Sequence, residues 1–213
     1  MIFQYPRRAH VRRHGPWGYR NYQSFKPWLR DEFDFRCVYC LWRERWYAVG
    51  EAAFSVEHLQ SQAVAPQLVC DYDNLVYACC RCNSVKTDAA TVLNPCRDAF
   101  GDHLEVLADG CIHDRTPEGR ELIRICRLDE PVLTESRRRL LDLLRTLRDS
   151  KSPKALSLLQ RYLAFPDNLP VLSKRHPSLG SVEDSPGRQD GRPYLPEVAN
   201  VLPSLNVAAN SVH

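Results

Sequence analysis

The sequence predicts an α+β fold: a small strand–loop–strand–helix core, a helical annex after it, and a disordered C-terminal tail. Three observations support this prediction. Two Cys-x-x-Cys pairs, Cys37/Cys40 and Cys79/Cys82, bracket a segment with the patterning of short strands. Beyond the second pair, apolar residues recur at helical spacing. From Pro166 onward the chain holds seven prolines with scattered serine, glycine and asparagine, which leaves too little apolar surface to fold.

These features divide the chain of 213 residues into four segments. Residues 1–30 form a basic and aromatic N-terminal arm, and residues 31–95 hold the core. Residues 96–165 form a hairpin and a helical annex, and residues 166–213 form the disordered tail. A chain of this length buries one ordinary core, with room for an appended subdomain.

The paired cysteines predict a structural zinc site. Each Cys-x-x-Cys pair forms a tight knuckle, and Cys37, Cys40, Cys79 and Cys82 together offer four thiolates to one tetrahedral ion. The adjacent Cys80 could compete with Cys79 as a ligand, but the spacing to Cys82 favours Cys79. A total of nine cysteines, an odd number, argues against a secreted disulfide scaffold and favours metal-bound thiolates in a reducing cytoplasm.

Composition also limits the location that we expect. The longest apolar runs fall far short of the roughly 20 residues that a membrane span requires. The basic N-terminus is followed by no apolar stretch of the kind found in signal peptides. We therefore expect a cytoplasmic protein that makes no contact with a membrane.

Local patterns place the first elements of the core. Pro27 is expected to begin a short helix that leads to the first cysteine pair. Residues 46–49 and 52–58 are expected to form two strands around a glycine turn. Because side chains alternate along a strand, His58 and Glu57 should point to opposite faces of the second strand.

The remaining core elements complete the unit. Residues 59–73 are expected to form a loop, and Leu75–Ala78 a short apolar strand. A helix should then begin near Cys82 or Asn83. The order is therefore strand, loop, strand, helix, with the second cysteine pair at the start of the helix.

The annex is expected to contain one hairpin and three helices. The hairpin joins His103–Leu107 to Cys111–His113 through a turn that contains Gly110. The three helices are one after the N-cap pair Thr116-Pro117, one over Val132–Arg148, and one from Ser152-Pro153 to about Leu163. Their apolar stripes indicate packing against the core.

The N-terminal segment is a candidate nucleic-acid contact. Net charge is only +3, but residues 1–30 hold basic side chains and no acid, interleaved with aromatic residues. This combination suits a phosphate backbone and exposed bases. The alternative is an arm whose aromatic residues pack on the domain. For four arginines we favour contact with nucleic acid: Arg7, Arg8, Arg12 and Arg13.

Read in order, the core residues resemble a known family. The pattern consists of the two Cys-x-x-Cys pairs, Glu57-His58, Asn74-Leu75, and an asparagine and lysine at Asn83 and Lys86. It resembles the HNH endonucleases, which have a ββα-metal active site, and the main resemblance covers residues 37–88. The resemblance implies a four-cysteine zinc subtype and the metal-dependent hydrolysis of phosphodiester bonds in DNA.

The resemblance also implies roles for individual residues. His58 would be the general base, a role that suits imidazole because its ordinary pKa lies near neutrality. Glu57 and Asn83 would hold a divalent cation, and their hard oxygen atoms favour Mg²⁺ or Mn²⁺. Asn74 would hold the loop that keeps the base in place. Lys86, one turn beyond Asn83, either contacts a phosphate or is a solvated helix lysine.

Two departures and one alternative accompany this hypothesis. The family more often has aspartate where this chain has Glu57, and proline where it has Ser61. The alternative is a noncatalytic zinc-knuckle module that binds nucleic acid, with Glu57 and His58 as relics. A plain zinc ribbon would not require Glu57, His58 and Asn83 at these places, so we favour the enzyme. The residues leave open whether the substrate is duplex DNA, single-stranded DNA or RNA.

Overall fold

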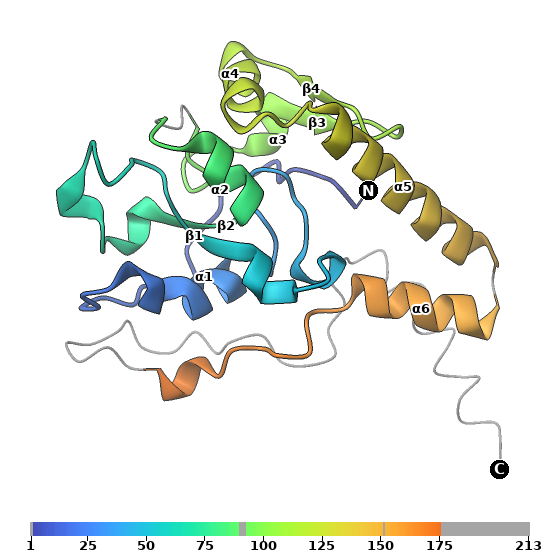
Figure 1. The fold of residues 1–213 in the computed structure, drawn as a ribbon, viewed down its shortest axis with the longest axis horizontal. Helices are drawn as coiled ribbons and strands as arrows, with labels where there is room; N and C mark the ends of the chain where they lie inside the picture. The colour runs from blue at the N-terminus through green and yellow to red at the C-terminus, as the bar shows by residue number, and fades with distance from the viewer. Residues whose placement is uncertain (1, 90–92, 151, 176–213) are drawn as a thin grey trace.

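A computed structural model describes residues 2–89, 93–150 and 152–175 of the chain (Figure 1). Its helices are α1 (Lys26–Glu32), α2 (Cys80–Lys86), α3 (Phe100–His103), α4 (Pro117–Cys126), α5 (Pro131–Ser150) and α6 (Pro153–Leu163). Its strands are β1 (Phe54–His58), β2 (Leu75–Cys79), β3 (Leu104–Val106) and β4 (Ile112–Asp114). The fold is therefore a mixed α+β fold, as the sequence predicts.

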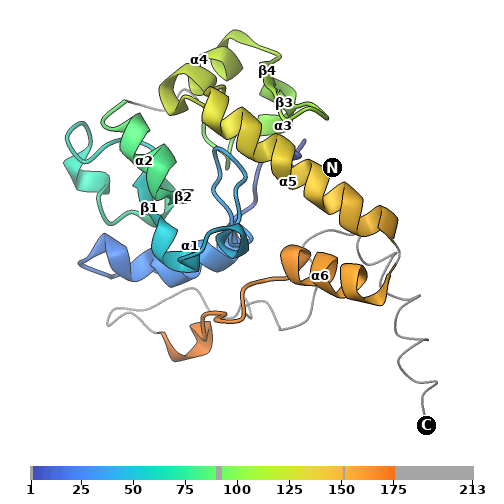
Figure 2. The same cartoon turned by 45° about the vertical axis from the view of Figure 1, so that its right-hand side comes forward.

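A β-hairpin between two helices forms the centre of the molecule. Strands β1 and β2 pair antiparallel, with Glu57 opposite Val76 and His58 opposite Leu75. Helix α1 lies on one side of this hairpin and α2 on the other (Figures 1 and 2). Because both faces are covered, every residue of β2 is buried, which explains its continuous apolar sequence.

The strand expected over residues 46–49 does not form, and the one over 52–58 begins two residues late, at Phe54. In their place the chain makes 3₁₀ turns at Glu44–Trp46 and Gly50–Ala53. The indole nitrogen of Trp46 donates to the carbonyl of Tyr162, 2.9 Å away. The alternation of apolar residues here thus reflects packing against a distant segment, not pairing with a strand.

The annex follows the predicted order. Strands β3 and β4 pair antiparallel, and α4 begins after Thr116, whose hydroxyl oxygen accepts a hydrogen bond from the amide of Gly119 at 3.1 Å. The buried Arg137 of α5 donates to the carbonyl of Gly110 at 2.6 Å and to that of Leu128 at 2.9 Å, which ties α5 to the hairpin turn. Gly110 has a φ of +86°, and a Cβ there would lie 2.8 Å from the α5 backbone, so glycine is required.

Both ends of the described chain pack more closely than the sequence suggested. Phe3 and Tyr5 of the predicted arm are buried in the core, and the Tyr5 hydroxyl donates to the carbonyl of Tyr39 at 2.5 Å. Within the predicted tail, residues 166–175 contact the core: Asp167 pairs with Arg45 at 2.6 Å. This segment is ordered because it supplies partners to buried or half-buried polar groups. Residues 176–213 of the predicted tail lie outside the described residues.

Within residues 2–89, 93–150 and 152–175, none of the helices combines the length and the apolar character needed to cross a bilayer.

Candidate active site and zinc centre

The four paired cysteines come together as predicted. The Sγ atoms of Cys37, Cys40, Cys79 and Cys82 lie within 4.8 Å of one another, and all four residues are buried. One tetrahedral zinc ion with Zn–S bonds of about 2.3 Å separates its sulfur ligands by roughly 3.8 Å, so this cluster fits zinc. Cys80 is exposed and turns toward the carbonyl of Ala52, so Cys79 is the ligand of the adjacent pair.

The zinc centre joins the hairpin to α2. Cys79 ends β2, and Cys82 lies in the first turn of α2. The first knuckle is held against the same strand, because the amide of Val38 donates to the carbonyl of Tyr77 at 3.0 Å. A zinc ion here would therefore fix where the helix starts relative to the strand.

His58 lies at the end of β1, where only 6% of the residue is exposed. Its Nε2 atom lies 3.0 Å from the carbonyl oxygen of Val69. Since a carbonyl can only accept, Nε2 carries the proton, and Nδ1 of the neutral ring has a free lone pair. Among the described residues, no hydrogen bond engages Nδ1. The ring thus has the tautomer that a general base at Nδ1 requires.

The pKa of His58 favours the same form. Burial lowers this pKa from its ordinary value of 6.5, and the positive charge of Lys86 acts in the same direction. The bond to Val69 opposes both effects without outweighing them. The imidazole is therefore neutral, and able to accept a proton, at pH 7.

Asn74 ties together the two segments that flank His58. Its Nδ2 atom donates to the carbonyls of Gln60 and Leu68, at 3.0 and 3.2 Å, and its Oδ1 atom accepts from the amide of Gln60 at 2.9 Å. The carbonyl of Asn74 also accepts from the amide of Leu59 at 2.9 Å. These bonds hold the residues after His58 close to the loop that carries the carbonyl of Val69.

Glu57 and Lys86 form a buried ion pair. Lys86 Nζ lies 2.7 Å from Glu57 Oε1 and donates to the carbonyl of His58 at 2.9 Å. Lys86 is 1% exposed, so it is not a solvated helix lysine, and its Nζ is occupied rather than open to a phosphate. Burial raises the pKa of Glu57 to about 7, although Lys86 acts to lower it. Lys86 follows Asn83 by about one turn of helix, so its position on the face toward β1 could have been predicted from the sequence.

Asn83 faces the same side of β1 as this ion pair. Its Nδ2 atom donates to Ser55 Oγ at 2.7 Å, which leaves the amide oxygen as an acceptor. Ser55 and Glu57 share one face of β1, and Asn83 and Lys86 share one face of α2. Glu57 and Asn83 therefore belong to one strand–helix interface and offer a carboxylate and an amide oxygen.

The composition of this oxygen set limits the ion that it could hold. In the described part of the chain, the four-cysteine cluster is the only group of three or more histidine, cysteine, aspartate or glutamate side chains placed to share a metal ion. A cation at Glu57 and Asn83 would take its other ligands from water or substrate, which is typical of Mg²⁺.

The four N-terminal arginines divide into two pairs. Arg12 lies between the rings of Phe33 and Tyr72, with its guanidinium carbon 5.2 and 4.7 Å from their centroids, and donates to the carbonyl of Leu75 at 2.7 Å. Arg13 pairs with the buried acids at the end of α1. Both therefore hold the N-terminal segment on the core.

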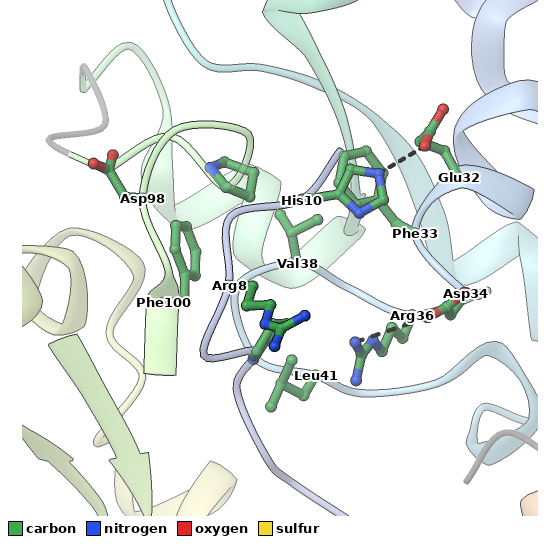
Figure 3. A pocket seen from close by; sticks show the side chains of 12 residues that line it. Arg8, His10, Glu32, Phe33, Asp34, Arg36, Val38, Leu41, Asp98 and Phe100 are labelled. Carbon is green, nitrogen blue, oxygen red and sulfur yellow. Dashed lines mark hydrogen bonds and ion pairs between the residues drawn. The ribbon is translucent and has the colours of Figure 1, made fainter. Parts of the chain in front are cut away.

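The other two arginines, Arg7 and Arg8, are exposed. Arg8 lines a cavity of about 60 Å³, and the apolar residues that line the same cavity include Phe33, Val38 and Phe100 (Figure 3). In the same view, His10 and Glu32 lie at one side, joined by a bond of 2.6 Å. The residues around His58 do not line this cavity.

Sequence reasoning missed one contact with His58. The ring of Tyr22, from the N-terminal segment, packs edge-to-face against the imidazole, with centroids 4.9 Å apart. No local signal marks Tyr22, because the two residues meet only through the tertiary fold.

Together, the hairpin, the helix and the four-cysteine cluster define a ββα unit with a site that fits zinc and with an acid, an imidazole and an amide beside it. Comparison with known proteins identifies the family that this unit resembles. Residues 37–89 match the HNH endonuclease family model. The chain thus carries an HNH endonuclease domain with a four-cysteine cluster, and an HNH domain indicates a nuclease or nucleic-acid-related function with a nucleic acid as partner. A search of curated proteins found no match to the chain.

Proposed function

We propose that this protein is a metal-dependent endonuclease that hydrolyses phosphodiester bonds in DNA, with His58 as the general base. The observation that carries the proposal is the bond from His58 Nε2 to the carbonyl of Val69. It leaves Nδ1 unprotonated, on a ring whose pKa is lowered by burial. The HNH match over residues 37–89 supports the reaction class.

In the proposed reaction, His58 Nδ1 removes a proton from a water molecule as the water oxygen attacks phosphorus. The bond from phosphorus to the 3′ oxygen breaks, and that oxygen takes a proton from solvent. The imidazolium that forms keeps its Nε2–H bond to Val69, which becomes charge-assisted and stronger. The proton on Nδ1 then returns to solvent.

Glu57 and Asn83 are the residues that we propose to hold Mg²⁺ or Mn²⁺. When bound, such a cation would supply positive charge for the phosphate and for the leaving oxygen. Lys86 pairs with Oε1 of Glu57, and no other hydrogen bond to this carboxylate occurs among the described residues. The second carboxylate oxygen is therefore the one available to a cation.

The noncatalytic alternative, a zinc-knuckle module that binds nucleic acid, has one observation in its favour. The ion pair with Lys86 neutralises Glu57 without any metal ion. A protein that had lost its catalytic cation could keep this pair as part of its core. Activity measurements separate the two functions, because both share the zinc centre and nucleic-acid binding.

The decisive experiment is a nicking assay on supercoiled plasmid with the zinc-loaded full chain, with and without Mg²⁺. We expect wild type to nick in Mg²⁺ and His58→Ala to be slower by roughly 10²- to 10⁴-fold, the usual contribution of a general base. His113→Ala is the matched control, since His113 is an exposed histidine on β4. Binding of the same DNA should be similar in all three proteins.

Three outcomes would count against the proposal. If wild type binds DNA but cleaves none of its forms in Mg²⁺ or Mn²⁺, the noncatalytic module is correct. Equal rates for His58→Ala and wild type would exclude His58 as the base. Cleavage of RNA but not of duplex or single-stranded DNA in parallel reactions would show that the substrate is RNA and not DNA.

A further inference from the structure

The N-terminal segment, which lies outside the HNH match, supplies one ring to the candidate base. Tyr22 and His58 have ring centroids 4.9 Å apart and planes inclined by 70°. Tyr22 is half-buried, whereas His58 is buried. The contact therefore joins the rim of the site to the side chain that would accept the proton.

The local structure holds Tyr22 in place. Tyr22–Phe25 form a 3₁₀ turn that begins after Asn21, whose Oδ1 atom accepts from the amide of Gln23 at 2.9 Å. Residues three apart in a 3₁₀ helix point the same way. Phe25 is completely buried and lies 5.7 Å from the ring of Tyr72, so it anchors the turn on the core. The position of Tyr22 follows from that anchor.

One hydrogen bond alone would define the imidazole plane poorly. The outer torsion of a histidine side chain has broad, roughly two-fold minima, so the ring can rotate or flip unless its neighbours prevent it. The carbonyl of Val69 fixes Nε2, and the ring of Tyr22 packs against the imidazole. The two contacts come from different segments and together restrict both rotation and flipping.

We propose that Tyr22 is a positioning residue: its aromatic ring holds the imidazole of His58 in the orientation that keeps Nδ1 available to the attacking water. The N-terminal segment thereby completes the active site. The expected effect of Tyr22 on cleavage rests on the proposed function, whereas its effect on the orientation of the His58 ring does not. The aromatic ring carries the effect, and the phenolic hydroxyl is dispensable.

Steady-state cleavage by Tyr22→Ala and Tyr22→Phe tests the role of the ring. Displacement of a reacting group by about 1 Å can cost up to roughly 10²-fold, so we expect Tyr22→Ala to lower kcat by about 10- to 100-fold with little change in KM. Tyr22→Phe keeps the ring and should stay near wild type. Gln23→Ala is the control, because Gln23 is an exposed polar residue in the same 3₁₀ turn as Tyr22. Equal losses in Tyr22→Phe and Tyr22→Ala would overturn the proposal.

A double-mutant cycle tests whether Tyr22 acts through His58. In the His58→Ala background, Tyr22→Ala should cause no further loss, because there is no imidazole left to position. If Tyr22→Ala lowers the residual rate of His58→Ala by the same factor as that of wild type, Tyr22 acts independently and the inference is wrong.

Nitrogen-15 NMR of the imidazole gives a readout that does not depend on cleavage. At pH 8, wild type should show a single neutral tautomer of His58 with the proton on Nε2, and so should Tyr22→Phe and Gln23→Ala. Tyr22→Ala should show averaged or doubled His58 signals while the rest of the spectrum stays folded. Unchanged His58 signals in a folded Tyr22→Ala would refute the positioning role. If wild type proves inactive, the proposed function fails, and this spectrum still decides the role of Tyr22.

Discussion

Replacement of Glu32 by glutamine should be one of the most damaging single changes to this fold. Glu32 ends α1 with 1% of the residue exposed. Its carboxylate receives four hydrogen bonds: from His10 Nε2 at 2.6 Å, from the amides of Arg13 and His14, both at 2.9 Å, and from the hydroxyl of Tyr72 at 3.1 Å. This one side chain therefore attaches residues 10–14 to the core.

The pKa of Glu32 shows how much its carboxylate contributes to the free energy of unfolding. Burial acts to raise this pKa, but the hydrogen bonds from His10, Arg13 and His14 outweigh it and lower the pKa from 4.5 to about 2. A carboxyl pKa lowered from 4.5 to about 2 on folding corresponds to about 3 kcal/mol of stability at neutral pH. Because the folded pKa is below the unfolded one, this stability is present above about pH 4.5 and is lost as the pH falls toward 2.

The assay is equilibrium urea unfolding of the zinc-loaded protein at pH 7. We expect Glu32→Gln to lower the free energy of unfolding by about 3 kcal/mol, since glutamine has no charge and one acceptor oxygen fewer. The exposed Asp129→Asn removes the same charge at the surface and should change stability by less than about 0.5 kcal/mol. Between pH 4.5 and 2, wild type should lose more stability than Glu32→Gln. Similar small losses for the two variants at pH 7 would refute this reasoning.

Three further predictions follow from the site. Cys79→Ser should lose zinc and fall in melting temperature, since binding at such sites contributes on the order of 10 kcal/mol, whereas Cys80→Ser should keep its zinc; equal metal content would contradict the ligand assignment. Cleavage at saturating Mg²⁺ should fall as the pH drops through a value below 6.5, because protonated His58 cannot act as a base; a flat profile would exclude this role. Arg8→Ala should flatten the dependence of log affinity on log salt by roughly 0.9 on duplex DNA without loss of stability, whereas Arg12→Ala should lower the melting temperature.

The four-cysteine cluster and the candidate catalytic residues are coupled through α2. Cys82 lies in the first turn of this helix, and Asn83 follows it directly. A zinc ion in the four-cysteine cluster would thus set the register in which Asn83 meets Ser55 and Lys86 meets Glu57. Removal of zinc should therefore disturb the oxygen ligands even though no thiolate takes part in the proposed reaction.

Local signals in the sequence determined much of the fold. The two Cys-x-x-Cys pairs bring four thiols to one point because each pair is a tight turn and the amide of Val38, within the first pair, bonds to the carbonyl of Tyr77 just before the second. Thr116 and Ser152 mark helix starts because their hydroxyl oxygens accept bonds from amides three residues along. The identities of His58 and Asn83 as candidate site residues likewise follow from a pattern read along the chain.

Tertiary structure decided the features that depend on partners from distant segments. Nothing near Lys86 in the sequence shows that it is buried against Glu57, and nothing near Arg12 shows that it lies between two aromatic rings. The ring of Tyr22 reaches His58 only because the N-terminal segment packs beside β1. The physical reason is common to all three: propensity and spacing act over a few residues, whereas the burial of a charge or a ring depends on which distant groups surround it.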